Sequence, residues 1–222
     1  MLALTLMPKM EKQLSRTAVP PYGGISDWST LREVAAQGYS DAILCLASIE
    51  IVERSNRDSV LGPLNENGAT KAARLMVDAT LFRVQIFIVR AFAPVRYPDD
   101  LHLRAAIDFL KYDNRVTEEQ RIERRSNLEM AIALFDAAAV DQRLEPLKHM
   151  RDKMLAHWAR PNESIPKPRY VDLFSFAKMT CSIWEELSFG AGTVMIELDN
   201  QIDAYREAAD DFWSIWEKKS GA

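Results

Sequence analysis

Apolar residues recur along most of this chain with the three-then-four spacing of an α-helix, and the alternation typical of a β-strand is almost absent. Glycine, which weakens helices, is scarce at 8 of 222 residues. A chain of this length can bury enough surface to fold as one domain without a metal or a disulfide. The sequence therefore predicts an all-α helical bundle of six to seven helices. Residues 26–222 are expected to form this single domain, and residues 1–25 a flexible N-terminal tail.

Capping residues and helix breakers give the expected boundaries of these helices. Ser26 or Asp27 can cap the first helix, and Gly62-Pro63 is expected to break the chain after it. The aspartates of the 97–100 turn are expected to cap the third helix. The helices are expected over residues 27–55, 69–92, 101–112, 117–140, 145–160, 171–189 and 197–218, the fourth of them opened by a capping box at Thr117–Gln120.

The two cysteines, Cys45 and Cys181, lie within apolar helical patterns, which favours buried free thiols over a disulfide. Free thiols fit a reducing compartment, so a cytoplasmic location is expected. No uninterrupted apolar run reaches the about 18 residues that a membrane-spanning helix needs. The opening segment also lacks the basic start and the long apolar middle of a secretory signal. We therefore expect no membrane partner.

One arginine occupies a position where the helical pattern calls for an apolar residue. Leu144, Leu147, Met154 and Trp158 follow the spacing of a core-facing stripe, and Arg151 falls in the same register. A guanidinium cannot shed its charge when it is buried. Arg151 therefore requires an acidic partner, a phosphate or a water-filled cleft.

The net charge of −4 argues against a general nucleic-acid binder, but the charge is unevenly distributed. Between Arg143 and Arg169 there are seven Lys or Arg residues and only three Asp or Glu residues. This basic excess is either a solvated face or a surface that binds an anion. Glu145 and His149 lack the mirrored histidine pair of a helical di-metal site, so neither a metal nor another cofactor is expected.

The spacing of Arg151 and His157 makes a site on one straight helix difficult. At about 100° per residue, side chains six residues apart point about 120° away from each other and lie roughly 9 Å apart along the axis. A second copy of the same helix across a two-fold axis can bring both groups to one point. Ala156 would permit the close backbone approach that such a contact requires.

The segment LKHMRDKMLAHWARP resembles the signature of the HEPN superfamily, in which an arginine and a polar residue precede a histidine. Arg151, Asp152 and His157 fit that signature with a gap of five residues. The wider frame FDAAAVDQRLEPLKHMRDKMLAHWARPNE and the earlier LHLRAAIDFLKYD resemble the AbiU-like branch, named for abortive phage infection. The resemblance implies a helical homodimer whose two Arg–His pairs line one cleft. It further implies metal-independent RNA cleavage, with a role as a toxin or phage-defence effector and an antitoxin protein as a partner.

The chemistry of these side chains agrees with such a cleavage. Imidazole is suited to proton transfer near neutral pH, and a planar guanidinium binds phosphate through paired N–H donors. We predict Arg151, His157 and Asp152 as catalytic residues. The predicted substrate-binding residues are Lys153, His149, Lys148 and Arg160. The alternative hypothesis is a non-catalytic helical module that binds a protein partner or a nucleotide, with Arg151 in an interior ion pair.

Overall fold

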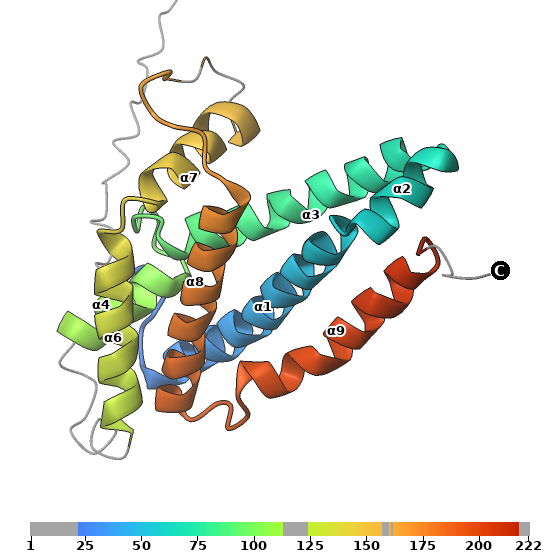
Figure 1. Ribbon diagram of the computed structural model, residues 1–222. Coiled ribbons are helices and arrows are strands. Elements are labelled where there is room, and N and C mark those ends of the chain that lie inside the picture. The colour runs from blue at the N-terminus through green and yellow to red at the C-terminus, as the bar shows by residue number, and fades with distance from the viewer. Residues whose placement is uncertain (1–21, 113–123, 157–159, 161, 218–222) are drawn as a thin grey trace, which may run out of the picture.

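The computed structural model describes residues 22–112, 124–156, 160 and 162–217, and within them it shows helices and no strand, which confirms the all-α prediction (Figure 1). The helices are α1 (Trp28–Ser55), α2 (Asp58–Glu66), α3 (Thr70–Ala91), α4 (Leu103–Tyr112), α6 (Arg125–Ala139), α7 (Leu144–Met150), α8 (Tyr170–Ala191) and α9 (Leu198–Ser214). A π-helical segment, η1 (Arg151–Ala156), continues α7. No helix in these ranges is both long and apolar enough to cross a membrane.

The long helix α1 is the centre of the bundle and packs against α3, α8 and α9. It begins as expected at Asp27, whose carboxylate accepts the backbone N–H of Thr30 at 2.8 Å. Gly38 allows α1 to approach α8 closely, because a Cβ at this position would overlap the ring of Trp184. The glycine inside this helix is therefore a packing requirement.

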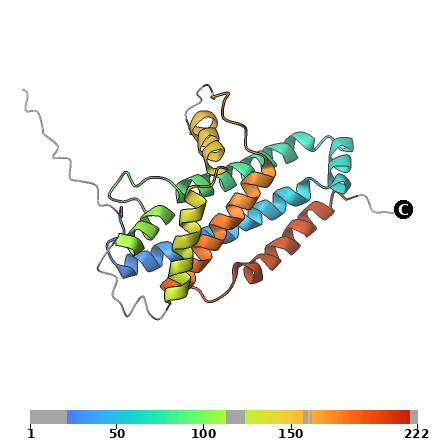
Figure 2. The same cartoon turned by 60° about the vertical axis from the view of Figure 1, so that its left-hand side comes forward.

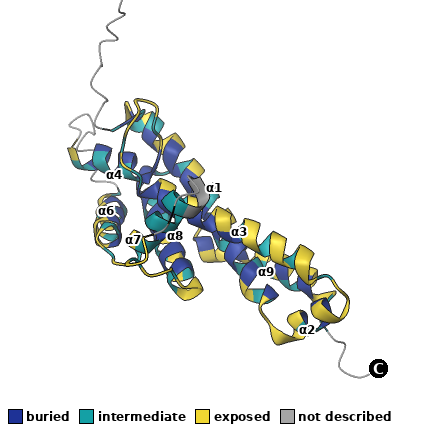
Figure 3. Ribbon diagram, turned by 90° about the horizontal axis from the view of Figure 1, so that it is seen from above, coloured by how far each residue is buried: buried dark blue, intermediate teal, exposed yellow. Residues whose placement is uncertain are grey.

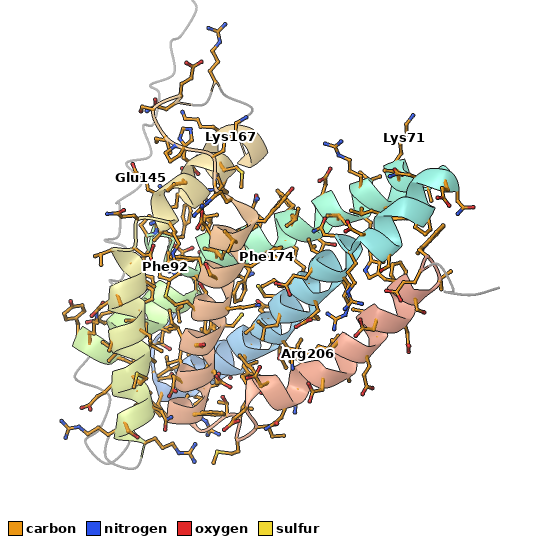
Figure 4. All side chains as sticks on the ribbon, in the orientation of Figure 1. Lys71, Phe92, Glu145, Lys167, Phe174 and Arg206 are labelled. Atoms are coloured by element: carbon orange, nitrogen blue, oxygen red, sulfur yellow. The ribbon has the colours of Figure 1, made fainter. Side chains whose placement is uncertain are left out.

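Aromatic side chains fill the core where α6 and α8 stand beside the end of α3. The ring of Phe92 stacks on that of Phe135 with centroids 5.0 Å apart, and it meets Phe176 edge-on at 5.4 Å. Figure 4 labels Phe92 between the ribbons of α6 and α8. Buried residues face inward along the length of the molecule, and the outer faces of α2 and α3 are exposed (Figure 3).

Ion pairs join α9 to α1 at the opposite end of the molecule from α7. Arg54 donates two hydrogen bonds to the carboxylate of Asp210, at 2.7 and 2.9 Å, and it also pairs with Glu50. Arg206 of α9 reaches Glu50 at 3.1 Å. The hydrogen bonds to Asp210 raise the pKa of Arg54, because they favour its charged form.

The expected chain break at Gly62-Pro63 was wrong, because both residues lie inside the short helix α2. The break comes instead at residues 56–57, between α1 and α2. Pro63 lies in the second turn of α2, where its missing N–H removes one hydrogen bond without ending the helix.

The expected cap of α4 was also wrong. The carboxylate of Asp100 accepts the backbone N–H groups of Arg96 and Tyr97, at 2.6 and 2.9 Å, and so closes its own turn. His102 caps α4 in its place, since its Nδ1 accepts the N–H of Ala105 at 3.3 Å. The predicted capping box at residues 117–120 lies outside the described residues.

The described part of the predicted N-terminal tail packs onto the fold. Gly24 donates its N–H to the carbonyl of Asp100 at 3.0 Å, and Ile25 is buried. Gly23 has a φ of 58°, which favours glycine at this turn. Residues 1–21 of the expected tail lie outside the described residues.

Candidate functional site

The predicted catalytic segment lies at one end of the α6–α8 pair, where α7 and η1 contact α3 (Figures 1 and 2). Leu144 and Leu147 anchor α7, and both are buried in the main core. Pro146 lies in the first turn, where its missing N–H has no helical partner to lose. The first half of the predicted apolar stripe therefore holds this helix on the bundle.

At Arg151 the helix changes from α to π geometry. Hydrogen bonds in a π-helix run from residue i to residue i+5, and such segments are rare and often occur at functional sites. The wider turn changes the rotation per residue along Arg151–Ala156, and the angle between Arg151 and His157 stays a prediction. His157 itself lies outside the described residues.

Arg151 departs from the stripe to which its spacing assigned it. Its side chain is 32% exposed, in contrast to the fully buried Leu147 one turn earlier. Its Nε lies 2.5 Å from Oδ1 of Asp152, yet this buried nitrogen makes no hydrogen bond, so the N–H is not aimed at that oxygen. The expected acidic partner is present, but it leaves donor capacity of the guanidinium unused.

Lys148 lies within the electrostatic reach of two guanidinium groups. Burial lowers the pKa of Lys148, and the positive charges of Arg104 and Arg151 lower it further, against the opposing charge of Asp152. A cation with a lowered pKa beside two other cations marks a locally positive site. We call Arg104, Lys148 and Arg151 the basic cluster.

Arg104 was not among the predicted site residues. This residue lies on α4 between the buried residues Leu103 and Ala105, in a segment that was predicted only as a helix and as part of the family resemblance. Its relation to Lys148 depends on how α4 packs against the α7 end of the bundle. The spacing of residues along the chain does not indicate that the charge of Arg104 acts on Lys148.

His149 faces a different part of the molecule. Its Nε2 accepts the backbone N–H of Asn162 at 3.0 Å, which assigns the proton of the neutral ring to Nδ1. His149 lines a pocket of about 710 Å³. Phe82 of α3, Tyr170 at the start of α8 and residues of the segment 162–169 also form its wall. None of the three cations of the basic cluster lines this pocket.

The two remaining predicted substrate-binding residues are available to a ligand. Lys153 is half-buried and Arg160 is exposed, and within the described ranges neither forms an ion pair. Figure 4 places Lys167 and Glu145 at this same end of the molecule, and Lys167 adds a further positive charge beside α7. No three His, Cys, Asp or Glu side chains in the described part of the chain are arranged to hold a metal ion.

Comparison with protein-family models decides the family. The model of the HEPN family AbiU2 matches residues 27–212, which is most of the chain. The chain belongs to the AbiU2 family of HEPN proteins. The match spans α1 to α9, so this HEPN domain includes the α1–α9 ion pairs as well as the basic cluster. Comparisons with curated proteins and with solved structures gave no significant match.

In this HEPN domain the basic cluster is suited to binding a phosphate. Arginine presents planar, paired donors that match phosphate oxygens, and lysine adds a point charge. His157, which the sequence places six residues after Arg151, would supply a group for proton transfer. These are the groups that a phosphodiester cleavage requires from a protein.

Proposed function

We propose that this AbiU2-family protein is a metal-independent endoribonuclease that acts as a toxin or phage-defence effector. The observation that carries the proposal is the environment and the hydrogen bonding of the Arg151 guanidinium. This group stands at the start of a π-helical turn, beside another cation, with a buried Nε that donates no hydrogen bond. A preorganised positive group with unused donors suits the charge that develops on a phosphorane.

The reaction uses a nucleophile that RNA itself carries. The 2′-hydroxyl attacks the adjacent phosphorus, a base removes its proton, and an acid protonates the departing 5′-oxygen. Arg151 stabilises the phosphorane, and Asp152 orients Arg151 from the neighbouring position. His157 and its copy in a second subunit share the acid and base roles, so the site is completed in a homodimer.

RNA with and without the attacking group tests this chemistry. The protein, treated with a metal chelator, is incubated with a single-stranded RNA and with the same strand carrying 2′-deoxy sugars. The proposal predicts cleavage of the RNA alone, with products that end in a 2′,3′-cyclic phosphate. Equal cleavage of both strands, or cleavage that requires a divalent metal, would contradict it.

A non-catalytic binding module is the second candidate, and two observations favour it. Arg151 has an acidic neighbour, Asp152, within its own chain, which offers its charge a partner without a bound phosphate. The pocket of about 710 Å³ beside His149 has a largely apolar lining that suits a small ligand or a partner's side chain. Absence of cleavage together with tight binding of a nucleotide or a protein would favour this candidate over the ribonuclease.

A further inference from the structure

Arg104 carries a charge that the described part of the protein does not neutralise directly. Its Nε is buried and makes no hydrogen bond, and within the described ranges no carboxylate lies within 4 Å of its guanidinium. Its Cζ lies 5.2 Å from the centroid of the Phe135 ring. The ring makes a cation–π contact with the guanidinium, but it accepts no conventional hydrogen bond from the Nε–H. A partly buried cation with unused donors is a feature that a bound anion would explain.

The charges around Arg104 strengthen this interpretation. Lys148 and Arg151 lie on the α7–η1 side, and among the described residues Lys148 forms no ion pair. Among the residues that the structure describes, the negative charges of Asp152 and Asp108 act on the basic cluster. Asp152 lies beside Arg151, and burial raises the pKa of Asp108, one turn after Arg104 on α4. Even with both carboxylates ionised, the three cations retain a net positive charge.

We propose that Arg104, Lys148 and Arg151 together bind one phosphate group of the single-stranded RNA substrate, with Arg104 as a substrate-binding residue supplied by α4. The identity of this phosphate as part of an RNA strand rests on the function proposed above. The presence of an anion site at the basic cluster does not. The guanidinium of Arg104, which also contacts the Phe135 ring, holds the phosphate oxygens while Arg151 faces the reacting phosphorus.

Binding of an RNA that cannot be cleaved tests the inference without relying on activity. A fluorescent single-stranded RNA with 2′-O-methyl sugars is titrated with the wild-type protein, Arg104→Gln, Arg104→Lys and the control Arg74→Gln. Arg74 is exposed near the far end of α3, and its loss removes the same charge away from the site. Thermal melting of each variant checks that it is folded.

Arg104→Gln is expected to weaken RNA binding about tenfold or more, which corresponds to the loss of a charged hydrogen bond of about 1.5–3 kcal/mol. The slope of log affinity against log salt should decrease by about 0.7, because one fewer phosphate charge is neutralised on a single strand. Arg104→Lys should retain the salt slope but bind more weakly than wild type. If Arg104→Gln does not fold, Arg104→Lys still tests the loss of the planar fork.

The outcomes separate this inference from the proposed function. Binding of the 2′-O-methyl RNA that depends on Arg104, in a protein that cleaves no natural RNA, supports the phosphate site and contradicts the ribonuclease. Natural RNA cleaved and bound equally well by wild type and Arg104→Gln overturns the phosphate site and leaves the ribonuclease intact. Loss of inorganic phosphate binding in Arg104→Gln, with RNA binding unchanged, also overturns the inference, since the anion site would then lie off the path of the strand.

Discussion

Nε of Arg151 lies 2.5 Å from Oδ1 of Asp152, but its N–H bond does not point at that oxygen. The pair is close enough for a strong Coulomb attraction, and both side chains are partly exposed to water. The carboxylate therefore holds the guanidinium near its place and leaves donors for another acceptor. Its charge also competes with any phosphate that approaches Arg151.

Asp152→Asn is expected to raise RNA affinity and to lower the cleavage rate. The amide removes a competing negative charge, which should tighten binding about two- to fivefold, as for a partly exposed ion pair of up to about 1 kcal/mol. The same change leaves Arg151 less firmly oriented, which should slow the chemical step. Binding of 2′-O-methyl RNA and single-turnover cleavage measure the two effects separately. Unchanged affinity together with an unchanged rate would show that Asp152 is only a surface residue.

Mixed dimers are expected to recover part of the activity that both parent variants have lost. In a dimer of one Arg151→Gln subunit and one His157→Ala subunit, each subunit supplies the group that the other lacks. If the site is composite, the shared cleft keeps one Arg151 to stabilise the phosphorane and one His157 for one of the two proton transfers, whereas each parent dimer lacks one kind of group entirely. Cleavage is measured after subunit exchange, which mass spectrometry of the dimers verifies. A mixture that exchanges fully and stays as inactive as its parents would rule out a composite site.

Lowering the pH below about 6.5 is expected to destabilise the fold through His102. Burial lowers the pKa of His102 below its ordinary value of 6.5, and the charges of Arg104 and Arg90 lower it further, against the opposing charge of Asp100. The unfolded chain therefore takes up a proton at a higher pH than the folded protein, so stability falls as the pH drops from 6.5 toward the folded pKa. Protonation of Nδ1 also removes the acceptor that caps α4.

His102→Asn is the matched variant for this pH dependence. Asparagine retains a side-chain oxygen that can cap α4 but has no group that titrates in this range. Urea denaturation from pH 7 to pH 5 should show a smaller loss of unfolding free energy in His102→Asn than in the wild type. Parallel pH profiles for the two proteins would show that His102 does not contribute.

Gly38→Ala and Gly62→Ala are expected to change stability in opposite directions. A Cβ at position 38 overlaps the Trp184 ring, and displacing that ring should lower the free energy of unfolding by about 1–3 kcal/mol. A Cβ at position 62 meets nothing within 4 Å, and there alanine should stabilise the helix interior by about 0.5–1 kcal/mol. Urea denaturation of both variants measures the difference. A Gly38→Ala protein with the unfolding free energy of the wild type would show that the close contact of Gly38 with Trp184 does not hold α1 against α8.

Local patterns were sufficient to predict the fold class and most helices of this protein. The Asp27 cap and the buried cysteines follow from residues that are neighbours in sequence, and both are present. The α4 cap was harder to predict, because Asp100 and His102 can each accept an N–H and only the turn geometry decides which group each one meets. Local competition between polar side chains therefore limited the prediction of boundaries.

The candidate site could be predicted only along one helix. Arg151, Asp152 and Lys148 were identified because they lie on α7 and η1, next to one another in sequence. The charge of Arg104 acts on Lys148 from α4, through tertiary packing that no periodicity along the chain can reveal. The π-helical turn also has no signature in residue spacing, yet it changes the backbone rotation per residue along Arg151–Ala156.

Single-turnover cleavage by His157→Ala tests the central claim most directly. The variant is compared with the wild type and with Arg74→Gln, on single-stranded RNA in the presence of a metal chelator, after its dimer and its thermal melting have been checked. Loss of a general acid or base should slow cleavage about 100- to 10,000-fold in the folded variant, while Arg74→Gln cleaves at the wild-type rate. Cleavage by folded His157→Ala at the wild-type rate would contradict the proposed ribonuclease site.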